Sequence, residues 1–185
     1  MTRGWKLALV AGAQIVILLS IIGVRQWAVR TGHTVVLKVA TGDPRSLLQD
    51  QYPYVRYDIS RIQRSGVRIA GKADGEVYVE LQRGSDGHWH AVAIHDNSDH
   101  AFKGTVLIKG HALRPPLYPA EAPGSADVIS LTYGVEDVSI ARGAAPDLPA
   151  GSGHDIGVEV RVDRFGQPQP RRFIVDGRAF DLHRR

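Results

Sequence analysis

Histidine and aspartate side chains that could bind a metal ion are densest between residues 86 and 100. The imidazoles are His88, His90, His95 and His100, and the carboxylates are Asp86, Asp96 and Asp99. His88 and His90 would share one face of a strand, a spacing that can place two imidazoles on one metal ion. No tight motif such as His-Glu-x-x-His is present, and histidine is ordinary in a polar hairpin. We therefore predict no metal site and no cofactor.

A second group of residues could support hydrolysis by a serine with a lysine base. Ser46 follows an apolar N-terminal segment, as in membrane-anchored, β-rich signal peptidases, and the candidate bases are Lys72, Lys103 and Lys109. Ser46 falls at an ordinary polar position, and no serine stands in a peptidase signature. The nucleophile elbow, the phosphate-binding loop and the dinucleotide fingerprint are also absent. The sequence favours a non-catalytic protein, with an envelope Ser/Lys hydrolase as the alternative.

The N-terminal segment has the length and composition of a membrane-spanning helix. Leu7 to Val24 is almost wholly apolar, and about 20 such residues cross a hydrocarbon core. The run is longer than the roughly 7–15 apolar residues of a cleaved signal peptide. A buried helix of a soluble domain should show a polar face, and this segment has none. We expect an uncleaved anchor within residues 1–30.

The charges around this segment favour export of the remaining residues, 31–185, as one domain. Basic residues nearly balance across it, with Arg3 and Lys6 before it and Arg25 and Arg30 after it. The positive-inside rule then gives a slight preference for a cytoplasmic N-terminus. The chain has no cysteine, which excludes disulfides and thiol chemistry. Its net charge of +4 is scattered, which suits anionic lipid headgroups better than nucleic acid.

Residues 31–185 show the two-residue alternation of strands with one buried face. The predicted strands are His33–Ala40, Glu76–Gln82, Trp89–His95, Thr105–Lys109, Val128–Val138, Ile156–Asp163 and Arg172–Val175. Two stretches rich in Pro, Gly and Ala, Arg114–Ala126 and Ala141–Gly153, are predicted surface loops. Pro168 and Pro170 are expected in a turn or at a sheet edge. The fold class is mainly β: a single transmembrane helix followed by one antiparallel β-rich domain, a sandwich or barrel-like fold.

The stretch from Gly42 to Ile59 combines a predicted helical turn with an extended segment. Asp43 can cap the turn that Pro44 opens, with Leu48 packed inward. From Tyr52 the chain is expected to be extended. The residues predicted to face the core are Val55, Tyr57 and Ile59, and those predicted to face solvent are Tyr54, Arg56 and Asp58.

At these residues the chain resembles the GDYXXLXY protein family. The matching positions are Asp43, Pro44, Arg45, Leu48, Tyr52, Val55 and Tyr57. Asp50-Gln51-Tyr52 stands where the family has Gly-Asp-Tyr, and Val55 replaces its Leu. Gln51 therefore cannot act as a base or a charged ligand. Later blocks at Tyr133–Glu136 and Val175–Arg178 are also similar. The resemblance implies a bacterial or archaeal envelope protein with one N-terminal membrane segment and a β-rich domain, and it supplies no catalytic residues.

The leading functional prediction is a membrane-anchored interaction module. Such a domain would offer an edge strand or its Pro-rich loops to a partner, with a polytopic membrane protein as the candidate. Arg45, Tyr54 and Arg56 are candidate surface or ligand contacts, and Arg45 is expected to pair with Asp50 rather than to line a cavity. A ligand-binding protein or enzyme with a pocket is the alternative. The expected location is the bacterial inner membrane, single-pass, with the C-terminal domain on the periplasmic side.

Overall fold

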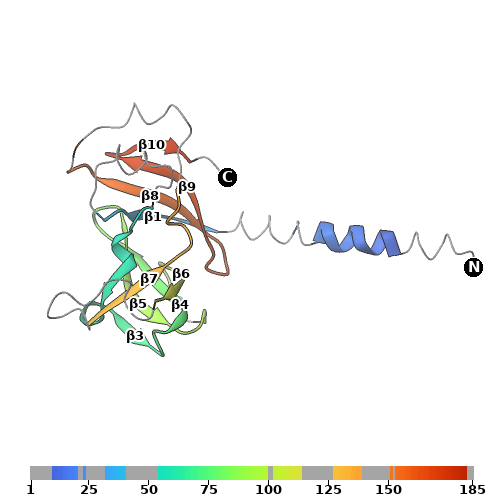
Figure 1. Cartoon of the computed structure of the whole chain (residues 1–185), viewed down its shortest axis with the longest axis horizontal. Helices are drawn as coiled ribbons and strands as arrows, with labels where there is room; N and C mark the ends of the chain where they lie inside the picture. Colours follow the sequence, from blue (N-terminus) through green and yellow to red (C-terminus); the bar gives the residue numbers. More distant parts are fainter. Residues whose placement is uncertain are drawn as a thin grey trace, which may run out of the picture.

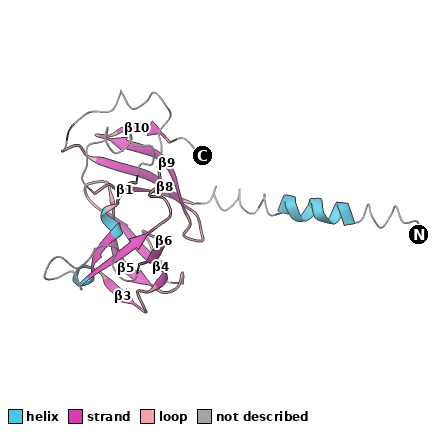
Figure 2. Ribbon diagram, viewed as in Figure 1, coloured by secondary structure: helices cyan, strands magenta, loops and turns pink. Residues whose placement is uncertain are grey.

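The computed structural model describes residues 10–20, 23, 32–40, 54–99, 102–113, 127–138, 151 and 153–182. The protein is mainly β, with a short stretch of helix at residues 10–20 (Figures 1 and 2). The elements are β1 (His33–Lys38), η1 (Asp58–Ser60), β2 (Arg61–Gln63), η2 (Arg64–Gly66), β3 (Arg68–Ala70), β4 (Gly75–Arg83), β5 (Trp89–His95), β6 (Thr105–Ala112), β7 (Val128–Thr132), β8 (Ile156–Val162), β9 (Pro168–Val175) and β10 (Arg178–Asp181).

The strands form two sheets. The first has the order β1-β8-β9-β10, and the second has the order β2-β7-β6-β4-β5-β3. The strand pairs are antiparallel, as predicted, except for β3 with β5, which is parallel. β3 has only three residues and follows η2, and it adds to the open side of β5 without needing a hairpin turn.

One hydrophobic core lies between the inner faces of the two sheets. It takes alternate residues from the strands, as the sequence pattern predicts. The first sheet contributes Leu37, Val160 and Phe173, and the second contributes Val79 and Ile108, all of them fully buried. Burial of this continuous apolar surface is the main driving force for the fold.

A backbone hydrogen bond joins the two sheets. The turn between β8 and β9 reaches β6, where the Lys109 amide donates to the Gly166 carbonyl at 2.8 Å. Gly166 has a φ of +80°, and a Cβ there would lie 3.2 Å from the Lys109 nitrogen. Glycine is therefore required for both the turn and the close approach.

Most of the predicted strands are present, with shifted ends. β5 has the predicted bounds, whereas β9 begins at Pro168, four residues before the predicted start. Because β10 pairs only with Arg172–Val175, Pro168 and Pro170 lie on a stretch with one neighbouring strand, in agreement with the sheet-edge prediction. The predicted strand Val128–Val138 is too long: β7 ends at Thr132, and Gly134 turns the chain with a φ of +72°.

Other predictions concern residues outside the described ranges. The predicted loop Arg114–Ala126 lies outside them, as does Ala141–Gly153 except for Gly151 and Gly153. The apolar segment Leu7–Val24 is described only at residues 10–20 and 23. Over the described parts of the chain, we find no helix with both the length and the apolar character needed to cross a membrane.

Candidate functional site

The described part of the stretch from Gly42 to Ile59, residues 54–59, alternates between buried and exposed side chains. The buried residues are Val55, Tyr57 and Ile59, and the exposed ones are Tyr54, Arg56 and Asp58. This alternation confirms the predicted inward face. The segment is not a continuous strand, because Tyr57 forms only a single bridge with Val39 and the helical turn η1 follows at once.

Two buried tyrosines connect this segment to residues 133–138. The Tyr57 hydroxyl donates to the Val135 carbonyl at 2.6 Å, and the Tyr133 hydroxyl donates to the Ile59 carbonyl at 2.7 Å. Each side chain thus satisfies a backbone acceptor of the opposite segment. We call these two contacts the tyrosine pair. Burial, reinforced by the Glu136 charge, raises the pKa of both hydroxyls well above the usual value for tyrosine.

Glu136 fixes the turn that carries Tyr133. Its side chain accepts a hydrogen bond from the Tyr133 amide, and its carbonyl accepts one from the Val55 amide at 2.8 Å. Glu136 is 5% exposed and Tyr133 is 6% exposed, so neither offers a reactive group to a substrate. These contacts hold two chain segments together, and the motif tyrosine Tyr57 is a structural residue.

The remaining predicted motif positions are Asp43, Pro44, Arg45, Leu48 and Tyr52, and all lie outside the described residues. The capped turn and the Arg45–Asp50 pair therefore stay predictions. Of the candidate surface contacts, Tyr54 is 58% exposed and forms a backbone bridge with Asp137. Arg56 is also exposed, and its carbonyl accepts a hydrogen bond from the Ala40 amide at 2.8 Å.

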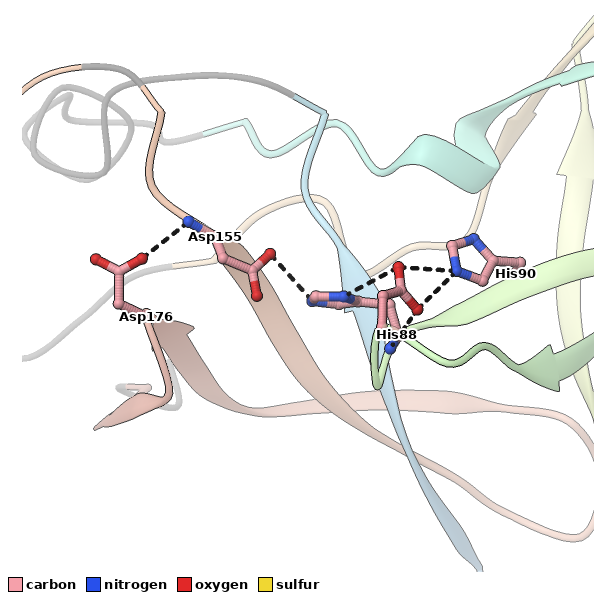
Figure 3. A network of polar contacts seen from close by, with 5 residues as sticks. His88, His90, Asp155 and Asp176 are labelled. Carbon is pink, nitrogen blue, oxygen red and sulfur yellow. Dashed lines mark hydrogen bonds and ion pairs between the residues drawn. The ribbon is translucent and has the colours of Figure 1, made fainter.

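A second polar cluster occupies the hairpin between β4 and β5 (Figure 3). The His90 Nε2 atom lies 3.1 Å from each oxygen of the Asp86 carboxylate, and the His88 amide donates to Asp86 Oδ1 at 3.1 Å. The hydrogen bond with His90 is the main cause that lowers the pKa of Asp86 to about 2. Gly84 is required beneath this contact, since a Cβ there would lie 2.6 Å from Asp86 Oδ1 and 2.7 Å from the His90 ring.

The His88 side chain reaches from this hairpin to the other sheet. It is 6% exposed. Its Nδ1 atom lies 3.6 Å from Asp86 Oδ2, and its Nε2 atom lies 3.6 Å from Asp155 Oδ1, just before β8. A Cβ at Gly157 would be 3.3 Å from His88 Nε2 and 2.9 Å from Val36 Cγ1. Gly157 therefore leaves the space that the imidazole occupies.

The cluster continues into the turn between β9 and β10. Asp176 adopts a φ of +48° and Gly177 one of +78°. The Asp176 carboxylate accepts a hydrogen bond from the Asp155 amide at 3.0 Å and lies 2.7 Å from His154 Nδ1. These contacts, the Asp155 amide first, lower the pKa of Asp176. We call the set Asp86, His88, His90, Asp155 and Asp176 the His–Asp network.

The structure separates the histidines that the sequence groups together. His95 Nε2 lies 3.0 Å from Glu80 Oε2, and both residues are at most 3% exposed. His100 lies outside the described ranges. Over the ranges that the structure describes, no three His, Asp or Glu side chains are arranged to hold a metal ion. The contacts of the His–Asp network connect the β4–β5 hairpin, the segment before β8 and the β9–β10 turn.

Within the residues that the structure describes, none of the three candidate lysine bases is seen paired with a serine nucleophile. Lys109 Nζ lies 2.8 Å from Glu76 Oε2, and this hydrogen bond raises the pKa of the lysine. A general base needs the opposite shift. Lys72 and Lys103 are exposed, and Ser46 lies outside the described residues.

Five acidic side chains in these contacts have no role that the sequence pattern predicted. They are Glu76, Glu80, Glu136, Asp155 and Asp176. For Asp176 a signal existed, because Asp-Gly between two strands is typical of a tight turn. Glu80 alternates with Val79 and Leu81, so the pattern gives it an outward position. It lies on that face, yet it is buried with His95.

The fold is a β-rich domain that follows an apolar N-terminal helix in the chain. The motif residue Tyr57 is buried in its core and donates a hydrogen bond to the backbone. This chain belongs to the GDYXXLXY protein family, whose sequence model matches residues 14–173. The match covers residues 14–20 of the helix, the motif segment and the strands from β1 to most of β9, and it ends before β10. Comparisons with curated proteins and with solved structures found no match.

The tyrosine pair predicts a specific loss of stability. Tyr57→Phe removes the donor to the Val135 carbonyl but keeps the ring, so the free energy of unfolding should fall by about 1–3 kcal/mol. Urea unfolding of the full chain in mild detergent, followed by circular dichroism, measures this change. Tyr54→Phe is the matched control on an exposed tyrosine and should change stability by less than about 0.5 kcal/mol. Equal effects of the two substitutions would contradict a structural role for the Tyr57 hydroxyl.

The His–Asp network predicts how Asp86 titrates. Because its folded pKa of about 2 lies below the ordinary 3.8, the contact stabilises the fold above about pH 4, and this contribution is lost as the pH falls toward 2. His90→Ala should raise the pKa of Asp86 toward 3.8, as followed by the carboxyl carbon chemical shift in NMR. His154 contacts Asp176 instead, so His154→Ala is the control and should leave the pKa of Asp86 unchanged. An unaltered titration in His90→Ala would refute the pairing.

Proposed function

We propose that this protein is a single-pass membrane protein of the bacterial inner membrane, with an exported β-domain that acts as a non-catalytic interaction module. The observation that carries the proposal is the exposure of its N-terminal helix. Six aliphatic side chains in residues 10–20 are 57–62% exposed: Val10, Ile15, Val16, Ile17, Leu18 and Leu19. A continuous apolar surface of this kind needs lipid or protein around it.

The absence of charge and the Ser20 contact in this helix are compatible with a bilayer. Residues 10–20 contain no charged side chain. The Ser20 hydroxyl donates to the Val16 carbonyl at 2.7 Å, so it needs no water partner. The apolar sequence continues on both sides, from Leu7 to Val24, and basic residues flank it. This length supports a spanning anchor.

The geometry of the β-domain favours binding over catalysis. The tyrosine pair is buried and its hydroxyls stay protonated, so the motif segment contributes rigidity and no acid or base. Lys109 is held as a cation by Glu76. These groups organise a scaffold, which leaves the strand edges and the surface for a partner.

The edge strand β10 is the best-supported contact surface. Within the part of the chain that the structure describes, β10 pairs with β9 only. Arg178, Ala179 and Asp181 are exposed, and the Arg178 guanidinium lies 5.9 Å from the centre of the Phe180 ring. An extended segment of a polytopic membrane protein could pair with the open edge through main-chain hydrogen bonds.

A single cysteine tests export and partner binding together, because the natural chain has none. In Ala179→Cys, a membrane-impermeant maleimide should label the protein in spheroplasts with an intact inner membrane. A photoactivatable crosslinker on the same cysteine should then yield one discrete adduct with an integral membrane protein. Ser98→Cys, exposed beyond β5, is the control and should be labelled equally but give no such adduct.

The labelling result and the crosslinking result test the two parts of the proposal independently. Labelling of both cysteines only after lysis would refute export of the domain. Labelling in spheroplasts with the same diffuse adducts at both positions would refute β10 as the docking edge.

A further inference from the structure

The turn between β8 and β9 lies where the chain enters the β-domain from the helix. His33, the first residue of β1, pairs with Val162, the last residue of β8. A Cβ at Gly32 would lie 2.5 Å from the Val162 carbonyl oxygen, so the entering chain runs directly against the start of the turn. The turn lies beside the first residues of β1 (Figure 1).

This turn presents an aromatic ring and a cation together. Phe165 is 49% exposed, and the Arg164 guanidinium lies 4.5 Å from the centre of its ring. Aromatic and basic side chains of this kind are enriched where proteins meet lipid headgroups. The neighbouring carboxylate of Asp163 is already engaged, because it accepts hydrogen bonds from the Phe165 and Gln167 amides at 2.8 and 2.9 Å.

The turn is also rigid. In addition to the two Asp163 contacts, the Gly166 amide donates to the Asp163 carbonyl at 3.0 Å, and the Gly166 carbonyl accepts from Lys109. Phe165 is therefore held outward by the fold and is not exposed by fraying. A preformed contact of this kind loses little conformational entropy on binding.

Chain length places this turn near the anchor. Residues 24–31 separate the last described helical residue from Gly32, and eight residues span at most about 30 Å. The same stretch carries Arg25 and Arg30. Basic residues thus occur both in this connecting sequence and in the turn, at Arg164, which favours an anionic surface.

We propose that Arg164 and Phe165 contact the anionic headgroup region of the bilayer and set the orientation of the β-domain on the membrane. This inference rests on the proposed anchor, and it adds a second, surface-bound contact to it. The partner is the lipid bilayer itself, with the ring entering the interfacial region and the guanidinium binding phosphate.

The experiment places a fluorophore beside the contact and a quencher on the lipid. Full-length protein with Gln167→Cys carries an environment-sensitive dye and is reconstituted into vesicles of phosphatidylcholine and phosphatidylglycerol that contain nitroxide-labelled lipid. Tyr54→Cys is the control, since Tyr54 is exposed but lies past the opposite end of β1, where Val39 bridges Tyr57. Ile17→Cys reports on the anchor.

We expect headgroup nitroxide to quench the dye at position 167 at least about twofold more than the dye at position 54. Adding Arg164→Ala and Phe165→Ala should reduce quenching at 167 to the level at 54, and Arg164→Glu alone should reduce it in the same direction. Equal quenching at positions 167 and 54 would overturn the inference, and so would quenching at 167 that persists after these substitutions. In either case, quenching of the dye at position 17 by nitroxide deep in the bilayer would still support the anchor. Absence of quenching at 17 would overturn the anchor and the inference with it.

Discussion

The reciprocal hydrogen bonds of the tyrosine pair are the constraint on which the rest of the domain depends. Residues 54–60 contribute three core side chains but only isolated bridges and one helical turn. Their carbonyls are therefore not satisfied by a regular ladder, and buried acceptors need donors. Tyr133 donates to the Ile59 carbonyl of this segment, and Tyr57 donates in return to the Val135 carbonyl, each across a separation of more than 70 residues. Each aromatic ring fills the core while its hydroxyl fixes the backbone of the other segment.

Other contacts outside the regular ladders also join separate segments of the chain. The Gly166 carbonyl satisfies the Lys109 amide at the point where β6 has not yet met β7. His88 fills the space over Gly157 between two carboxylates, and Asp176 orders the entry to β8. An apolar interior supplies most of the stabilisation, and polar contacts at the turns set the relative placement of the sheets. The polar residues in these contacts are thus used for structure.

Sequence alternation was sufficient for the strands that pair over many residues, because each of them buries one complete face. It predicted β5 correctly and placed Val55, Tyr57 and Ile59 inward. It missed β3, since three residues carry no periodicity and a parallel neighbour leaves no turn signal. It also grouped His88 with His95, which are close along the chain; the structure instead pairs His95 with Glu80 across strands. Tertiary contacts of this kind leave no local pattern.

A motif that could have marked an active site is a structural joint of the β-domain. Hydrogen exchange of the Val55 amide, which donates to the Glu136 carbonyl, tests that claim most directly. If the joint is integral to the fold, this amide should exchange as slowly as that of Val79 in β4, and Tyr57→Phe should accelerate it while Val79 remains protected. Fast exchange of Val55 in the natural protein, or protection unchanged by Tyr57→Phe, would contradict the account.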